Sequence, residues 1–254
     1  MTKIDNLNNI SLQKALIGYD IDTFYFDEID STNNYAKLLL KRDSPNRSLI
    51  VANTQTAGRG RQGNSFFSPS QTGIYMSILF NTYGQMDKNE VTIRVATTCI
   101  KAIYNLTKKK VLIKWVNDLF FNGKKIGGIL TESIGESSWI IVGIGINLFT
   151  SDFPTDLVNI AGSLDNKRIT RAQLIAEITK IFFDQKDTFQ EIISYYKDNC
   201  FILGKEIAFS INNKSYSGKA IDINLSGNLI VKTNEETLTL NSGEISLKSS
   251  SFSQ

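Results

Sequence analysis

The segment around Asn122-Gly123 constrains the fold most, because this dipeptide is the one preferred in a two-residue type I′ hairpin turn. The apolar run Leu119–Phe121 should therefore be a strand that pairs, after the turn, with a second strand over Lys125–Ser133. A second turn at Gly135-Glu136-Ser137 leads into another apolar run, Trp139–Leu148. These runs predict neighbouring antiparallel strands in one sheet.

Apolar patterns elsewhere add strands and helices to this sheet. Alternating apolar residues predict a strand, and apolar residues at helical spacing predict a helix. Strands are expected over Thr23–Ile29, Ser48–Ala52, Gly73–Asn81 and Val111–Val116, and helices over Asn33–Lys41 (N-capped by Asp30-Ser31-Thr32), Val91–Leu106 and within Arg171–Tyr196.

The character of the chain changes after Cys200. Short alternating runs, separated by Asn, Ser and Gly, occupy about 50 residues, and Gly227-Asn228 is another hairpin signal. Five such strands predict a small β-barrel. We place a domain boundary near residue 202, with one domain over residues 1–202 and a second over 203–254. The five runs are Glu206–Ile211, Tyr216–Ile223, Leu229–Lys232, Thr237–Leu240 and Glu244–Leu247.

The composition excludes several chemistries. The 254 residues include no histidine, so Ser-His-Asp and Cys-His nucleophile systems and His-ligated zinc are excluded. Two cysteines, Cys99 and Cys200, cannot form a disulfide framework or a zinc cluster. We expect no metal site held by the protein, and two buried thiols in a reducing cytosol. The net charge of +3 is too small to indicate nucleic acid by itself.

No segment predicts export or a membrane span. The first ten residues carry Asp5 and several Asn instead of a long apolar stretch. The longest apolar run, Trp139 to Phe149, is about half of the roughly 20 residues that a membrane helix needs. We therefore expect a cytoplasmic protein that does not contact membranes.

A glycine-rich loop carries two arginines. Gly58-Arg59-Gly60-Arg61-Gln62-Gly63 matches the dinucleotide pattern G-x-G-x-x-G, but residues 64–69 make a poor helix start, and that site needs a helix there. The arginines remain informative, because a planar guanidinium suits phosphate and carboxylate groups and glycines let the backbone approach a ligand. A solvated basic loop and a nucleic-acid contact stay open as alternatives.

Glycines and polar residues interrupt the apolar strands. Gly127 and Gly128 in one strand and Gly143 and Gly145 in the next would leave a trough for a ligand, although bulges or helix packing would also explain them. A lysine, Lys125, begins the first of these strands. A trough with a lysine and an arginine loop fits an elongated apolar acid beside a phosphate group. Positioning and charge stabilisation would then carry catalysis.

In order and spacing, six motifs together resemble those of the biotin protein ligases, over about residues 20–250. The resemblance implies an α+β fold, with a mixed β-sheet flanked by helices (a class II synthetase-like catalytic domain) and a C-terminal SH3-like β-barrel. The motifs are Asp30-Ser31-Thr32-Asn33, Gln55-Thr56-Ala57-Gly58-Arg59-Gly60-Arg61-Gln62-Gly63, Lys114-Trp115-Val116-Asn117-Asp118-Leu119, Lys125-Ile126-Gly127-Gly128-Ile129-Leu130, Gly143-Ile144-Gly145-Ile146-Asn147 and Gly243-Glu244-Ile245-Ser246-Leu247.

The resemblance also implies a reaction in two steps. Biotin and ATP with Mg²⁺ give biotinyl-5′-AMP and pyrophosphate, and biotin then passes to a lysine of the biotin carboxyl carrier protein of acetyl-CoA carboxylase. The implied catalytic residues are Lys125 and Arg61, on the carboxylate and phosphate, and Asp118, on the incoming lysine. The implied biotin-binding residues are Ser31, Thr32, Gln55, Gly58, Arg59, Gly60, Lys125, Gly128, Gly143 and Gly145, and the ATP-binding residues are Arg61, Phe66, Lys114, Asn117 and Asn147.

Three positions depart from the family pattern. The family commonly has Pro at Val116, a backbone change that we expect to be tolerated. It often has a basic residue at Asn64 and Trp at Phe66, so a phosphate contact and part of the stacking area on adenine should be lost and the affinity for nucleotide should be affected. About 30 residues precede Asp30, fewer than the helix-turn-helix of larger members needs, so we expect no operator binding and no DNA partner. Related enzymes can pair through a sheet edge, and a homodimer stays open.

Two other functions remain as alternatives. A lipoate or octanoate ligase or transferase has the related fold, but the arginine loop and the barrel favour biotin. A non-enzymatic nucleic-acid-binding module would bind with a steep salt dependence, but it gives no reason for the glycine trough or Lys125.

Overall fold

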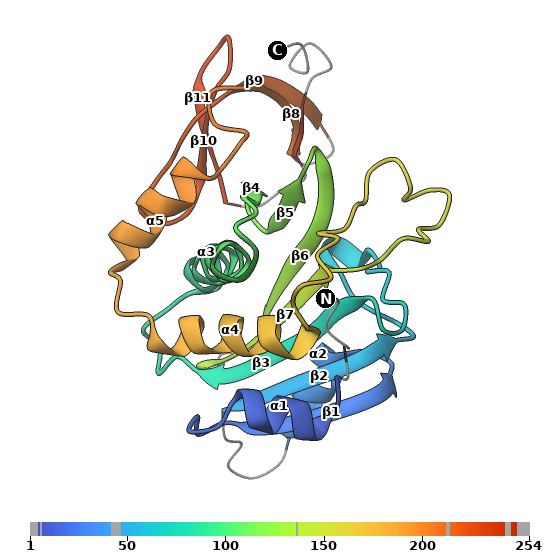
Figure 1. The fold of residues 1–254 in the computed structure, drawn as a ribbon. Helices are drawn as coiled ribbons and strands as arrows, with labels where there is room; N and C mark the ends of the chain where they lie inside the picture. The colour runs from blue at the N-terminus through green and yellow to red at the C-terminus, as the bar shows by residue number, and fades with distance from the viewer. Residues whose placement is uncertain are drawn as a thin grey trace.

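The computed structural model describes residues 5, 7–41, 47–135, 137–211, 214–241 and 245–247. A seven-stranded sheet in the order β1-β2-β3-β7-β6-β5-β4 forms its centre (Figure 1). Strands β1 and β2 are parallel and all other neighbours are antiparallel, so the sheet is mixed, as predicted. The strands are β1 (Asp22–Ile29), β2 (Ser48–Gln55), β3 (Gly73–Asn81), β4 (Leu112–Lys114), β5 (Asp118–Phe121), β6 (Lys124–Ser133) and β7 (Trp139–Asn147).

The predicted hairpin between β5 and β6 is confirmed. Phe121 pairs with Lys124, and Asn122 and Gly123 have φ values of 50° and 75°, as both central residues of a type I′ turn require. The next turn includes Gly135, with a φ of 57°, while Glu136 lies outside the described residues.

The strand predicted over Val111–Val116 is too long. Strand β4 ends at Lys114, and Trp115 and Val116 form a turn whose Trp115–Val116 peptide bond is cis. The carbonyl of Val116 accepts a hydrogen bond of 2.9 Å from the buried Tyr196 hydroxyl instead of pairing with a strand.

Five helices lie in the described part of the chain: α1 (Asn9–Ala15), α2 (Thr32–Leu39), α3 (Lys88–Thr107), α4 (Arg171–Asp184) and α5 (Phe189–Asp198). Asp87 caps α3, and capping boxes begin α4 at Thr170 and α5 at Thr188. The sequence pattern did not predict α1. Ser31 is the N-cap of α2, as expected, but its side chain makes no capping hydrogen bond.

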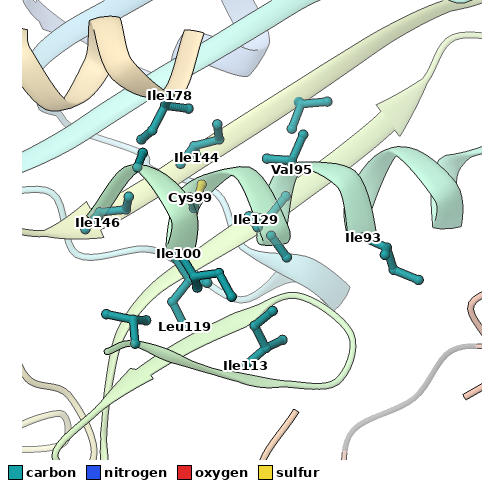
Figure 2. Close-up of a cluster of buried hydrophobic side chains, with 14 of the residues drawn as sticks. Ile93, Val95, Cys99, Ile100, Ile113, Leu119, Ile129, Ile144, Ile146 and Ile178 are labelled. Carbon is teal, nitrogen blue, oxygen red and sulfur yellow. The ribbon is translucent and has the colours of Figure 1, made fainter. Parts of the chain in front are cut away.

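Successive side chains of β7 point to opposite faces of the sheet. Ile144 and Ile146 face the main core, where α3 presents Val95, Cys99 and other apolar side chains (Figure 2). Ile141 faces the other side and packs with Ala36 of α2 in a smaller cluster. Gly143 and Gly145 follow Ile141 at intervals of two residues and therefore lie on the face that α2 covers.

The C-terminal part is a five-stranded antiparallel sheet in the order β11-β10-β9-β8-β12, strongly curved at β9 (Figure 1). Together with the mixed sheet, it confirms the predicted fold class. The boundary that we expect near residue 202 falls between α5 and β8, and Gly243 and Glu244 lie outside the described residues. The strands are β8 (Glu206–Ile211), β9 (Lys214–Ile223), β10 (Leu229–Lys232), β11 (Thr237–Leu240) and β12 (Ile245–Leu247).

The turn after β4 in the mixed sheet contacts a loop of the C-terminal sheet. The indole Nε1 of the buried Trp115 donates a 2.9 Å hydrogen bond to the carbonyl of Gly227, in the loop between β9 and β10. Gly227 has a φ of 75°, and a Cβ there would lie 2.4 Å from Ile93 of α3. In the described part of the chain, no helix is long and apolar enough to span a membrane.

Candidate active site

A cavity of about 470 Å³ lies on the α2 face of the mixed sheet. The structure brings nearly all the predicted site residues to its walls, although they come from separate strands, turns and a loop. Gly58 and Asn147 are the two predicted residues that do not line the cavity. The lining includes Ser31, Thr32, Gln55, Arg59, Gly60, Arg61, Phe66, Lys114, Asn117, Asp118, Lys125, Gly128, Gly143 and Gly145.

The C-terminal sheet also contributes to the cavity wall, which the sequence reasoning missed. Ala208, Phe209 and Ser210 of β8 and Ser215 of β9 line the cavity, with Ile245 of β12. Their alternating apolar pattern is typical of any small barrel, so no signal in the sequence distinguishes this edge from the others.

Gly128, Gly143 and Gly145 line the cavity as a trough, and Gly128 is directly opposite Gly145 in the β6–β7 pair, whereas Gly127, which we also expected in the trough, does not line it. Side chains of other residues occupy part of the trough. A Cβ at Gly145 would lie 2.6 Å from the ring of Phe66, and one at Gly143 would lie 2.5 Å from Oδ1 of Asn33. The glycines therefore admit both an aromatic ring and the first turn of α2.

A β-bulge aims Lys125 into the cavity. Leu119 pairs with Gly127 and Phe120 with Lys125, so the extra residue is Ile126. The bulge puts Lys125 on the same face as Gly128, where its Nζ lies 2.7 Å from Oδ1 of Asp118. The lysine and the carboxylate for which the resemblance implies catalytic roles thus form an ion pair.

The arginine loop folds back on itself over the cavity. The amide of Gly60 donates to the carbonyl of Asn64 at 2.7 Å, and that of Phe66 donates to Gly58 at 2.9 Å. Arg61 Nη1 donates to Oδ1 of Asn117 at 2.9 Å, which ties the loop to the turn between β4 and β5. Only a 3₁₀ turn, Arg61–Gly63, follows the glycines, so this is not a dinucleotide-binding turn.

Gly58 has a structural place in this loop. A Cβ there would lie 2.5 Å from the carbonyl oxygen of Phe66 and 2.6 Å from Oγ of Ser68. The glycine lets the two sides of the loop approach each other, which places Arg59 and Arg61 without Gly58 itself reaching the cavity.

Asn147 is buried beside the cavity residues of β7. Its Nδ2 donates to the carbonyl of Gly162 at 3.1 Å, while its Oδ1 is buried without a hydrogen-bond partner in the described part of the chain. An unpartnered buried oxygen costs about 1–3 kcal/mol, so a donor from a ligand would be favourable there.

The two cysteines are buried thiols. Burial raises the pKa of Cys200 to about 12 and also raises the pKa of Cys99 well above its ordinary value. Both stay protonated at neutral pH, so neither supplies a nucleophile.

Comparisons with known proteins show the family to which the chain belongs. Residues 25–147 match the biotin/lipoate A/B protein ligase family, and residues 202–248 match the biotin protein ligase C-terminal domain. The bifunctional ligase/repressor BirA of Bacillus subtilis is 32% identical over 237 residues, which are 88% of this chain and 73% of that protein. The chain therefore belongs to the biotin protein ligase family.

Two further relatives match over nearly their whole length. The biotin--[acetyl-CoA-carboxylase] ligase of Mycobacterium tuberculosis is 20% identical over 254 residues, covering 94% of this chain and 95% of that protein. The structure of the biotin protein ligase from Aquifex aeolicus in complex with biotin and ATP has a TM-score of 0.76 and 25% identity, and covers 89% of this chain and 98% of that one.

Proposed function

We propose that this chain activates biotin with MgATP to give biotinyl-5′-AMP and pyrophosphate, and then transfers biotin to a lysine of a biotin carboxyl carrier protein. The observation that carries the proposal is the cavity itself. It joins an apolar glycine trough to Lys125 and to a loop with two arginines. This combination suits an elongated apolar acid whose carboxylate meets a phosphate.

Biotin would lie along the trough. Ser31, Thr32 and Gln55 at one end would bind the ureido ring, and the backbone of Arg59 and Gly60 would complete that wall. The valeryl chain would cross Gly128, Gly143 and Gly145 toward Lys125. Since the ring of Phe66 now covers Gly145, this ring would move aside or stack on the ligand.

Adenylation would depend on charge rather than on a protein nucleophile. The biotin carboxylate attacks the α-phosphorus of ATP, the bond to the β-phosphate oxygen breaks, and pyrophosphate leaves. Lys125 and Arg61 would stabilise the charge that develops on the phosphate. Lys114, Asn117, Phe66 and Asn147 would contact the nucleotide.

The transfer of biotin to the carrier lysine would use the carboxylate of Asp118, which is ion-paired with Lys125. The carrier lysine attacks the acyl carbon of the adenylate, AMP leaves, and the ammonium must lose a proton. Asp118, held 2.7 Å from Lys125, would orient that ammonium or take its proton.

Magnesium would enter with ATP. The described residues contain no group of three or more Cys, Asp or Glu side chains that could hold a metal ion. The phosphates would therefore supply most of the ligands, and we treat MgATP as the substrate.

The match to the biotin protein ligase C-terminal domain favours biotin over lipoate or octanoate. We place the reaction in the cytoplasm, where ATP and reduced thiols are found. A homodimer stays open, and we expect no operator binding. A gel shift of a biotin-operon DNA fragment by this chain at moderate salt would contradict the expected lack of operator binding.

Mass spectrometry of a carrier domain after incubation with MgATP and biotin, lipoate or octanoate tests the proposal. We expect the mass of one biotinyl group on one lysine, with biotin alone. Modification by lipoate or octanoate instead would assign the chain to the related ligases, and no modification by any acid would contradict the proposal.

A further inference from the structure

Tyr196 is a buried, titratable side chain that the proposed chemistry does not use. It lies near the end of α5, and its side chain is fully buried. Burial raises the pKa of its hydroxyl well above the ordinary value, so the hydroxyl keeps its proton at neutral pH. The hydroxyl donates to the carbonyl of Val116 at 2.9 Å. Tyr196 therefore supports the turn between β4 and β5 from the side of α5.

Two charged residues of the cavity wall act on this same hydroxyl. The carboxylate of Asp118 adds to the rise in the pKa of Tyr196 that burial causes, and the guanidinium of Arg61 opposes it. The hydroxyl is thus close to both groups, although Tyr196 itself does not line the cavity. Any effect of Tyr196 on a ligand must therefore pass through the turn.

The hydrogen bond to Val116 helps to place the next residue, Asn117. The carbonyl of Val116 and the backbone N–H of Asn117 belong to one planar peptide group, so Tyr196 sets the plane from which Asn117 extends. On its other side, Asn117 is held by Ile129 of β6. Its carbonyl accepts from the Ile129 amide at 3.0 Å, and its Nδ2 donates to the Ile129 carbonyl at 3.0 Å. Asn117 is therefore fixed between α5 and β6.

This placement determines what Asn117 offers to the arginine loop. Because Nδ2 is used by Ile129, Oδ1 faces the loop and accepts from Nη1 of Arg61 at 2.9 Å. A hydrogen bond weakens steeply when its angle is lost, so a small rotation of the turn would weaken the contact with Arg61. Two hydrogen bonds and one peptide group thus connect Tyr196 to the loop.

The segment that follows α5 supports the same turn. The amide of Ile113 in β4 donates to the carbonyl of Asn199 at 2.8 Å, and the amide of Phe201 donates to the carbonyl of Ile113 at 3.1 Å. Between them lies Cys200, whose pKa burial raises to about 12. The backbone amide of Trp115 is among the groups that oppose this rise, so it faces the Cys200 sulfur. Cys200 and Tyr196 therefore support two successive residues of the turn.

We infer that Tyr196 is a positioning residue that holds Asn117 in place as the acceptor for Arg61, and that α5 thereby keeps the arginine loop over a bound ligand. The inference rests on the proposed function, in which that ligand is biotinyl-5′-AMP. A purely structural role would affect the ligand equally with and without Arg61. A role that passes through Arg61 ends when Arg61 is removed, so a double-mutant cycle separates the two.

The test is the dissociation rate of supplied biotinyl-5′-AMP from the four chains of this cycle, measured by rapid filtration. Tyr196→Phe removes only the hydroxyl, so the adenylate should leave about three- to tenfold faster than from the wild-type chain, as expected for one weakened contact. In the Arg61→Gly chain, the same substitution should change the rate by less than about twofold, because the contact on which it acts is already gone.

Tyr195→Phe is the matched control. It removes the hydroxyl of the adjacent residue, whose ring centre lies 5.0 Å from Nζ of Lys101 on α3. This variant should release the adenylate at the wild-type rate. An unchanged rate in folded Tyr196→Phe, or the same fold-change with and without Arg61, would overturn the inference.

A second pair of variants decides the question if Tyr196→Phe does not fold. Cys200→Ala removes the sulfur that lies beside Tyr196 and faces the Trp115 amide, and Cys99→Ala removes the same group from the main core. Cys200→Ala should release the adenylate at least about threefold faster than Cys99→Ala, because only the first loosens the turn. Equal rates would overturn the inference alone. A wild-type chain that does not bind biotinyl-5′-AMP would overturn the proposed function as well.

Discussion

Lys125 is the residue on which the proposed chemistry depends most. Its side chain is 40% exposed and pairs with Asp118, so it can reach a ligand without a large structural change. Lys125→Ala should reduce the rate of biotinyl-5′-AMP formation by about 10²–10³-fold, the range found when one group that stabilises transition-state charge is removed. Biotin affinity should fall by less than about tenfold, since the cation acts mainly on the developing phosphate. Single-turnover adenylation and calorimetric biotin binding measure the two effects.

Lys124→Ala is the matched control for this variant. Lys124 is the exposed neighbour on the same strand, and its Nζ donates to the carbonyl of Val158 instead of facing the cavity. It should adenylate biotin at nearly the wild-type rate. Unchanged adenylation in Lys125→Ala would reject the role that we give to Lys125.

The limits of sequence reasoning are also clear at single positions. The motif identifies Lys125, but no residue type marks Ile126 as the extra residue of a bulge, because the bulge follows from how β5 and β6 pair. Glu132 was overlooked because its contacts, to Asn33, Lys37 and Arg59, come from residues far away in the sequence.

At the scale of elements, we propose that the arginine loop acts as a cover for the cavity. Arg61 fastens it to Asn117. Arg61→Gly should increase the dissociation rate of biotinyl-5′-AMP by about tenfold or more, because one charge-assisted contact is lost and the loop gains freedom. Free adenylate would then label lysines of a bystander protein such as serum albumin. Rapid filtration and albumin labelling measure both effects.

Gln62→Gly provides the control for that loop. Gln62 has a φ of 54°, which glycine adopts without strain, and it is adjacent to Arg61. The variant changes the same loop without removing the contact to Asn117, so it should retain the adenylate. If Arg61→Gly retains the intermediate as tightly as Gln62→Gly does, the loop is not a cover.

Glu132 connects β6 to α2 and to the arginine loop through its contacts with Asn33, Lys37 and Arg59. The stability that these contacts provide should depend on pH. Its pKa lies below the ordinary value of 4.5, so its stabilising effect is present above that value and is lost as the pH falls through the folded-state pKa. At pH 7, Glu132→Gln should lower the free energy of unfolding by about 1–2 kcal/mol. Urea unfolding of both proteins from pH 7 to pH 3 should show this difference shrinking, and a constant difference would contradict the expectation.

Local turn chemistry explains which elements could be predicted. Asn122-Gly123 sets the turn between β5 and β6 and the pairing next to it through positive φ values, and the glycines of β6 and β7 show in the sequence as interruptions of apolar strands. Strand β4 was predicted too long because Trp115 and Val116 are apolar for another reason. They are buried in the turn beneath Tyr196 and Gly227.

At the scale of the whole molecule, the C-terminal sheet is part of the site. Its β8 and β9 line the cavity, and Trp115 connects it to the mixed sheet through Gly227. Trp115→Phe should destabilise the protein by about 1–3 kcal/mol, because the buried carbonyl of Gly227 loses its donor. Thermal unfolding, with Trp139→Phe as a partly exposed control, measures the loss. Equal melting temperatures for the two variants would contradict the role of this bond.

The central claim is that the cavity activates biotin with ATP, and pyrophosphate release tests it most directly. The chain should be incubated with MgATP and biotin, lipoate, octanoate or no acid, without a carrier domain. We expect release that depends on biotin and amounts to about one pyrophosphate per active site, since the adenylate stays bound. Release with lipoate or octanoate alone, or no release with any acid, would contradict the account.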